Sequence, residues 1–148
     1  MVGEGGAQVT YSHYTDSPRE ALYPFGFGLS FTEFEYGDIE LSADSFSEDE
    51  KIEASISVKN TGNMVGEETV QLYLHDLVGS ITRPNLELKA FEKISLKPGE
   101  RKVVNFIIDK EMITYFTINK KWEAEAGDFE VMIGGNSVDL KKANFEFK

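Results

Sequence analysis

Paired carboxylates are the first feature of this sequence that could do chemistry, because two acidic groups held about 5–10 Å apart across a cleft can hydrolyse a glycosidic bond. Glu67 and Glu68 are adjacent, and Glu123 and Glu125 lie close together. Both pairs fit such a role by residue type only. Neighbouring residues of a strand point to opposite faces, so Glu67 and Glu68 cannot converge on one substrate by themselves. We interpret them as exposed charges at a strand edge and predict no catalytic residue in this chain.

Oxygen and nitrogen ligands for a metal ion are also present. The acidic stretch from Asp44 to Glu50 could offer carboxylates to calcium, but it lacks the spacing of a calcium-binding loop and is more typical of a solvated loop. His13 and His75 are the two histidines, and they are weak evidence for a metal site because nothing local brings them together. We expect both to be solvated. There are no cysteines and hence no thiolate ligands. We predict no metal site and no cofactor.

A ring-rich segment between Leu22 and Phe34 could instead bind a partner. Its large side chains are Tyr23, Phe25, Phe27, Leu29 and Phe31. Gly26 and Gly28 alternate with these rings, which lets the backbone approach a surface closely while the rings supply apolar area. We expect an extended arm that docks on a partner domain. Packing of the arm against the body of this chain is the alternative.

Trp122 could serve as a platform for a sugar ring. It stands beside Lys120, Lys121 and Glu123, so we expect it to be partly exposed. Packing in the core or at a sheet edge is the interpretation that we favour for a single tryptophan.

The elements that must position these residues have a period of two, which is typical of half-buried strands. The expected strands are 34–41, 52–58, 70–74, 86–96, 101–109, 129–133 and 143–147. A type II turn is expected at Lys97–Glu100, where Pro98 and Gly99 fit its two central positions. The apolar phase slips near Ala90 and Phe91, which predicts a bulge. Glu111 to Phe116 could form one helical turn. About seven short strands predict an all-β, two-sheet sandwich.

Composition limits the class of protein. A chain of 148 residues is long enough for one domain with its own core. Its net charge of −11 argues against nucleic acid and anionic membranes as partners. No apolar run approaches the ~20 residues that span a bilayer. Met1 to Gly6 does not look like a signal peptide, and the compartment stays open.

Several segments resemble, in order, the markers of one domain family. They are Tyr23–Phe31 (YPFGFGLSF), Val58–Gly62 (VKNTG), Gly66–Leu74 (GEETVQLYL), Arg83–Pro84 with Glu87–Lys93 (ELKAFEK), Leu96–Glu100 (LKPGE) and Gly127–Gly134 (GDFEVMIG). Together they resemble the C-terminal fibronectin type III-like domain of family 3 glycoside hydrolases, the β-glucosidase and β-xylosidase group. Ala90 and Ala126 depart from the usual glycine and proline, which bears on local geometry only.

The resemblance implies an immunoglobulin-like or fibronectin type III-like sandwich over residues 22–148, preceded at 1–21 by an irregular leader from an upstream domain that is missing. It also implies that the aspartate nucleophile and the acid/base residue of the parent enzyme lie in upstream domains, since no position here matches their motifs. The expected role is a non-catalytic accessory domain whose partners are the catalytic domains of a glycosidase. By family analogy the loop Leu77–Pro84 could border the active site, with Arg83 as a candidate sugar contact beside Trp122. The alternatives are a carbohydrate-binding module and an independent enzyme.

Overall fold

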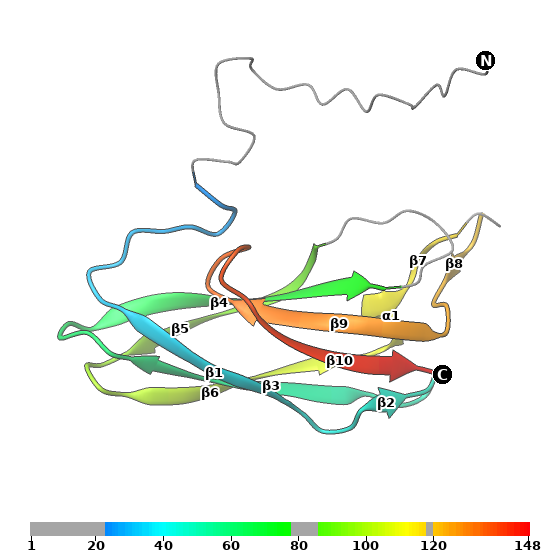
Figure 1. The fold of residues 1–148 in the computed structure, drawn as a ribbon, viewed down its shortest axis with the longest axis horizontal. Helices are drawn as coiled ribbons and strands as arrows, with labels where there is room; N and C mark the ends of the chain where they lie inside the picture. Colours follow the sequence, from blue (N-terminus) through cyan, green and yellow to red (C-terminus); the bar gives the residue numbers. More distant parts are fainter. Residues whose placement is uncertain (1–22, 78–85, 118–119) are drawn as a thin grey trace, which may run out of the picture.

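Alternating apolar and polar side chains fold this chain into a two-layer β-sandwich, as predicted. The computed structural model describes residues 23–77, 86–117 and 120–148 (Figure 1). The seven long strands are β1 (Phe34–Leu41), β3 (Ile52–Asn60), β4 (Gly66–Asp76), β5 (Glu87–Leu96), β6 (Arg101–Ile108), β9 (Gly127–Gly134) and β10 (Lys141–Phe147). Each of them overlaps a strand predicted from the sequence. The predicted leader, residues 1–21, lies outside the described residues.

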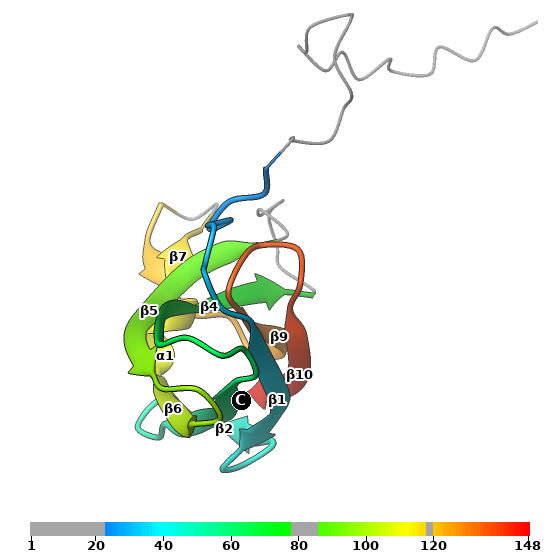
Figure 2. The same ribbon diagram turned by 90° about the vertical axis from the view of Figure 1, so that its left-hand side faces the viewer.

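The strands form two sheets that face each other (Figure 2). One sheet has three strands in the order β1-β3-β6, and the other has five in the order β2-β10-β9-β4-β5, where β2 is Ser45–Phe46. All neighbours are antiparallel except β10 and β2, which run parallel. A separate two-stranded ribbon joins β7 (Tyr115–Phe116) to β8 (Trp122–Glu123). The sequence did not predict these short strands.

The core lies between the sheets and is built from the inward residues of each strand. In β3 every second residue is buried, from Ile52 to Asn60. Phe46 of β2 packs against the rings of Phe145 and Phe147, with centroids 5.8 and 5.2 Å away. Since β2 and β10 are far apart in the sequence, this aromatic cluster fixes one edge of the five-stranded sheet.

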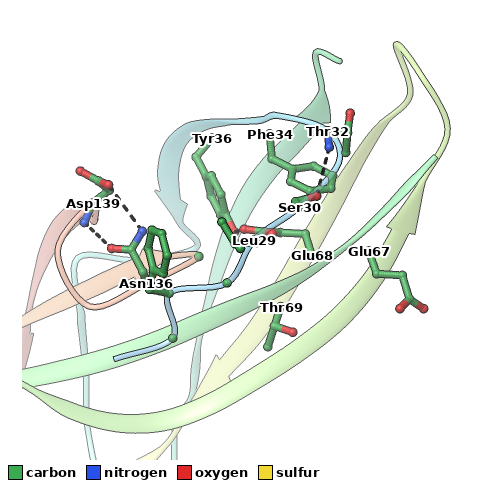
Figure 3. Close-up of a pocket in the computed structure, with 14 residues that line it drawn as sticks. Leu29, Ser30, Thr32, Phe34, Tyr36, Glu67, Glu68, Thr69, Asn136 and Asp139 are labelled. Atoms are coloured by element: carbon green, nitrogen blue, oxygen red, sulfur yellow. Dashed lines mark hydrogen bonds between the residues drawn. The ribbon is translucent and has the colours of Figure 1, made fainter. Parts of the chain in front are cut away.

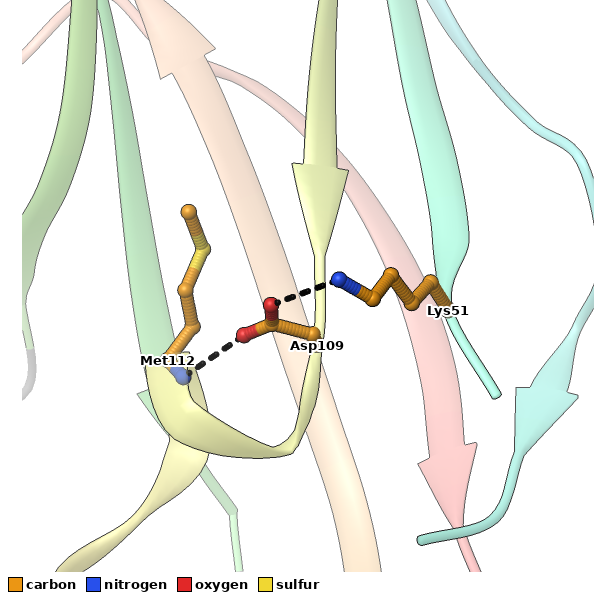
Figure 4. A network of polar contacts seen from close by, with 3 residues as sticks. All are labelled: Lys51, Asp109 and Met112. Carbon is orange, nitrogen blue, oxygen red and sulfur yellow. Dashed lines mark hydrogen bonds and ion pairs between the residues drawn. The ribbon is translucent and has the colours of Figure 1, made fainter. Parts of the chain in front are cut away.

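A short helix, α1 (Lys110–Ile113), lies between β6 and the β7–β8 ribbon. The Asp109 carboxylate caps it, because its Oδ1 accepts a hydrogen bond from the Met112 backbone N–H at 3.2 Å. Its Oδ2 lies 3.4 Å from Nζ of Lys51, the residue just before β3 (Figure 4). The prediction of a helical turn at Glu111–Phe116 was wrong at its C-terminal end, where Tyr115 and Phe116 form β7.

The predicted turn and bulge are both present. The backbone N–H of Glu100 donates to the Lys97 carbonyl at 3.0 Å, and Gly99 has φ of +76° as a type II turn requires. The register of β4 against β5 shifts where Leu72 faces Ala90 and Tyr73 faces Leu88, so the bulge lies just before the predicted position. Within the described part of the chain, no helix is long and apolar enough to cross a membrane.

Candidate functional site

The ring-rich segment, residues 23–31, is called the arm from here on, and it begins with a tight turn. The backbone N–H of Phe27 donates to the Pro24 carbonyl at 3.0 Å. Gly26 at the corner has φ of +79°, which is why glycine is needed there. The Phe25 carbonyl accepts a hydrogen bond from the Ser137 N–H at 2.9 Å, so the β9–β10 loop holds the turn.

The same turn lies directly on the outer face of β4. A Cβ atom on Gly26 would sit 2.3 Å from Gln71 Nε2, so the two groups are in close contact. Gln71 is buried even though it points away from the core. Its Nε2 donates to the Gly135 carbonyl at 2.8 Å, and its Oε1 accepts from the Tyr73 hydroxyl at 2.5 Å. A buried glutamine whose amide nitrogen and oxygen are both hydrogen-bonded therefore lies beneath the arm.

The other end of the arm is fixed through Thr32. Its hydroxyl donates to Asn60 Oδ1 at 2.6 Å, and Asn60 is fully buried. Asn60 Nδ2 donates to the carbonyls of Met64 and Leu96 at 2.8 and 3.0 Å. The arm is thus tied to the sandwich by the Phe25 carbonyl and, directly after its last residue, by the Thr32 side chain.

In contrast, the side chains of the arm are exposed. The exposed fractions are 65% for Tyr23, 65% for Phe25, 47% for Phe27, 95% for Leu29 and 90% for Phe31. Tyr23 and Phe27 lie ring against ring, with centroids 5.1 Å apart. The structure therefore brings the five predicted docking residues together on one segment, and within this chain they do not join the core. Docking on a partner stays a prediction.

A hollow of about 530 Å³ lies between the arm, β1, the start of β4 and the β9–β10 loop (Figure 3). Its residues are Gly26, Phe27, Gly28, Leu29, Ser30, Thr32, Phe34, Tyr36, Glu67, Glu68, Thr69, Gly135, Asn136 and Asp139. The Tyr36 hydroxyl donates to Glu68 Oε1 at 2.7 Å. A Cβ on Gly135 would lie 2.1 Å from the same oxygen, so a larger residue there would require the Glu68 carboxylate to move.

This geometry corrects the prediction for Glu68, which is half-buried and not an exposed edge charge. Burial raises the pKa of Glu68 above its ordinary value, and the hydrogen bond from Tyr36 lowers it in part. The pKa of Tyr36 is also raised, first by burial and then by the Glu68 charge. Glu67 points the other way, as predicted, and pairs with Lys93 at 2.7 Å on the surface. No local pattern predicts the Tyr36–Glu68 bond, because the two residues are 32 positions apart in the sequence.

The acidic loop is organised by its own hydrogen bonds. Glu50 Oε2 accepts from the N–H and hydroxyl of Ser47, at 2.9 and 2.8 Å, and these bonds lower the pKa of Glu50. Among the described residues, no three His, Asp or Glu side chains are grouped as metal ligands would be. His75 lies half-buried in β4 opposite Glu130, and His13 lies outside the described residues.

Of the two locations that we favoured for Trp122, the core and a sheet edge, the structure places it at an edge, in β8 of the two-stranded ribbon. It is 72% exposed, and its ring meets that of Phe116 across the β7–β8 ribbon with centroids 5.7 Å apart. The two-residue strands of this ribbon lie outside both large sheets, so no layer covers the indole. Arg83, the second candidate sugar contact, lies outside the described residues.

Comparisons with known proteins place this geometry in context. A family model described as a fibronectin type III-like domain matches residues 68–137. The periplasmic β-glucosidase of Salmonella typhimurium is 46% identical over 135 residues, which are 91% of this chain and 18% of that protein.

Solved structures agree with the sequence matches. A β-glucosidase of Erythrobacter marinus superposes with a TM-score of 0.86 at 36% identity, over 93% of this chain and 18% of its own. The β-glucosidase of Listeria innocua solved with glucose gives a TM-score of 0.84 at 37% identity, over 92% of this chain and 19% of its own. This chain therefore spans about a fifth of the length of the relatives it matches.

Proposed function

Because this chain belongs to the C-terminal fibronectin type III-like domains of family 3 glycoside hydrolases, we propose that it is a non-catalytic accessory domain of a β-glucosidase-type enzyme. Its role is to stabilise the catalytic domains by covering apolar surface on them. The whole enzyme hydrolyses terminal β-glycosidic bonds of carbohydrates, and the groups that do so lie outside this chain.

The arm is the observation that carries this proposal. The arm is bonded to the sandwich through the Phe25 carbonyl, and the hydroxyl of Thr32, which directly follows the arm, binds Asn60, while the large side chains of the arm are exposed to water. An ordered, exposed apolar segment of this kind is typical of an interface. Burying one such side chain contributes roughly 1.5–3 kcal/mol. A few of them suffice to hold two domains in one relative position.

The geometry does not favour an independent enzyme. The carboxylate of Glu68 is bonded to Tyr36, and that of Glu67 points away to Lys93, so the adjacent pair does not converge on one cleft. We expect the purified chain to release no nitrophenol from aryl β-glucosides or β-xylosides. Steady hydrolysis by the chain alone, copurifying with it through two chromatographic steps, would disprove the proposal.

A chimera tests the docking role directly. In it this chain replaces the matching 18% of the periplasmic β-glucosidase of Salmonella typhimurium. We expect the chimera to be active, and the double variant Phe25→Ser/Phe27→Ser to lose activity faster on heating because two docked rings are removed. The unfolding temperature of the isolated chain should barely change, since both rings are exposed.

Val103→Ser is the matched control for the chimera, because Val103 is also apolar and 55% exposed but lies on the outer face of the other sheet. Thermal inactivation of the Val103 variant should equal that of the unsubstituted chimera. An inactive chimera, or equal inactivation of all three proteins, would contradict the docking role.

Carbohydrate binding is the second candidate function, and the exposed indole of Trp122 is the observation that favours it. Affinity gel electrophoresis of the isolated chain on soluble β-glucans would measure it. Retardation that Trp122→Ala abolishes would establish a sugar site there. Equal mobility with and without glucan would remove this candidate.

A further inference from the structure

The outer face of β5 carries two exposed apolar side chains, and the strand register fixes where they point. Phe91 is 69% exposed and Leu88 40%. Phe91 lies opposite Gln71, and Leu88 lies opposite Tyr73. Gln71 and Tyr73 alternate along β4 with the core residue Leu72, so they point outward. Residues directly opposite each other in a sheet share a face, which places Phe91 and Leu88 on the outer side of the five-stranded sheet.

This is the face on which the arm lies. Gly26 is in close contact with the Gln71 amide, and Phe25 and Phe27 flank Gly26. Phe91 is therefore one strand spacing, about 4.8 Å, from the residue beneath the arm. Figures 1 and 2 both show the arm leaving the sandwich on the side of the five-stranded sheet. The rings of the arm and of Phe91 are thus exposed on the same side of the five-stranded sheet.

Polar groups border this surface along β5. Lys93 and Ser95 follow Phe91 on the same face, and Lys93 pairs with Glu67 of β4. An apolar centre with a charged margin is the usual composition of a protein interface.

The outer face of the three-stranded sheet carries polar side chains along its central strand, β3. The outward residues of β3 are Glu53, Ser55, Ser57 and Lys59. The exposed aliphatic side chains of β6, Val103 and Ile107, lie beside these polar groups.

We infer that the docking surface extends from the arm across β5 through Phe91 and Leu88, and that its occupant is an apolar patch on the catalytic part of the same β-glucosidase polypeptide. This inference rests on the proposed function. The relatives support the choice of occupant, since about four fifths of their length lies outside the matched segment. The outer face of the three-stranded sheet is left to solvent.

Hydroxyl-radical footprinting of the chimera tests this inference, because it reports the exposure of individual side chains. Labelling of Phe91 should fall about fivefold or more relative to the isolated chain, as for a side chain in the dry centre of an interface. Ile107 and Val103 should be labelled equally in both proteins. If the arm is protected but Phe91 is labelled as in the isolated chain, this inference fails and the proposed function stands. If the arm itself is labelled equally in both, the proposed function fails.

A substitution gives a second readout. Phe91→Ser should shorten the half-life of chimera activity at elevated temperature by roughly fivefold, the effect of losing one well-packed interface ring. Val103→Ser should leave it unchanged. The unfolding temperature of the isolated chain should be similar for both variants, which separates docking from folding. Equal half-lives for the two chimera variants would overturn the inference.

Discussion

Asn60 joins three parts of the chain through one buried amide. It binds Thr32 at the base of the arm, Met64 in the following loop and Leu96 at the end of β5. The family-like sequence VKNTG places this asparagine at the end of β3, where the amide supplies both a donor and an acceptor.

Removing this amide should destabilise the fold strongly. We expect Asn60→Ala to lower the free energy of unfolding by about 2–4 kcal/mol, because it leaves the buried Leu96 carbonyl without its donor and the Thr32 hydroxyl without its acceptor. Urea denaturation followed by circular dichroism measures this change. Asn63→Ala is the control, since Asn63 is exposed in the same loop. Similar midpoints for the two variants would show that the Asn60 bonds contribute little.

Glu68 should make stability depend on pH. Its pKa is raised in the folded state, so the folded chain binds this proton more tightly than the unfolded chain does. The charged form therefore costs stability at neutral pH, and that cost disappears as the pH falls through the raised pKa toward the ordinary value of 4.5. Glu68→Gln can keep the hydrogen bond from Tyr36 without the charge.

The measurement is the unfolding temperature from pH 7 to pH 4. We expect Glu68→Gln to be more stable than the natural chain at pH 7, with the difference shrinking toward pH 4. Glu67→Gln is the control, because Glu67 is exposed and paired with Lys93. If the unfolding temperatures of Glu68→Gln and the natural chain differ by the same amount at every pH, the pKa of Glu68 is not raised by folding.

Residue types alone could not reveal the surroundings of Glu68 or Gln71. Both are polar residues in a strand, and local sequence predicts that such residues face water. Glu68 is covered because Tyr36 and Gly135 converge on it, and Gln71 because the arm crosses it. These contacts link positions that are distant in the sequence and leave no local pattern. The rings of the arm were found because their composition is unusual at any position.

At the scale of elements, alternation predicted every long strand but not the shortest ones. A two-residue strand such as β7 or β8 has no period to detect, and β2 exists because β10 lies beside it. The bulge in β5 was predicted because the apolar phase slips there, and its position differed slightly because hydrogen bonding to β4 sets it.

Two adjacent isoleucines of β6 test this alternation. Ile108 is fully buried and Ile107 is 45% exposed. We expect Ile108→Ala to lower the free energy of unfolding by about 2–5 kcal/mol, and Ile107→Ala by less than about 1 kcal/mol, because only the first leaves a cavity in the core. Chemical denaturation of both variants measures the contrast. Equal losses would mean that the strand is turned differently.

At the scale of the whole molecule, one side of the isolated chain should bind hydrophobic compounds. The arm and Phe91 expose apolar rings that a partner is proposed to cover. We expect the native chain to enhance the fluorescence of a hydrophobic dye, and Phe25→Ser/Phe27→Ser to reduce the signal clearly. Dye titration at neutral pH measures this, with Val103→Ser as the control. If the native chain does not raise the fluorescence of the dye, the arm packs against the sandwich in solution.

The parallel pairing of β10 with β2 has a consequence for biosynthesis. The Asp44 and Phe46 carbonyls accept hydrogen bonds from the N–H groups of Glu146 and Lys148, at 2.9 and 3.0 Å. Phe145 and Phe147 of β10 also complete the aromatic cluster around Phe46. The pairing of β2 with β10 therefore cannot be complete until residue 148 has left the ribosome exit tunnel. A nascent chain stalled before β10 would hold β9 with one edge bare and Phe46 in water, so the sandwich should fold only after nearly all of it has been synthesised.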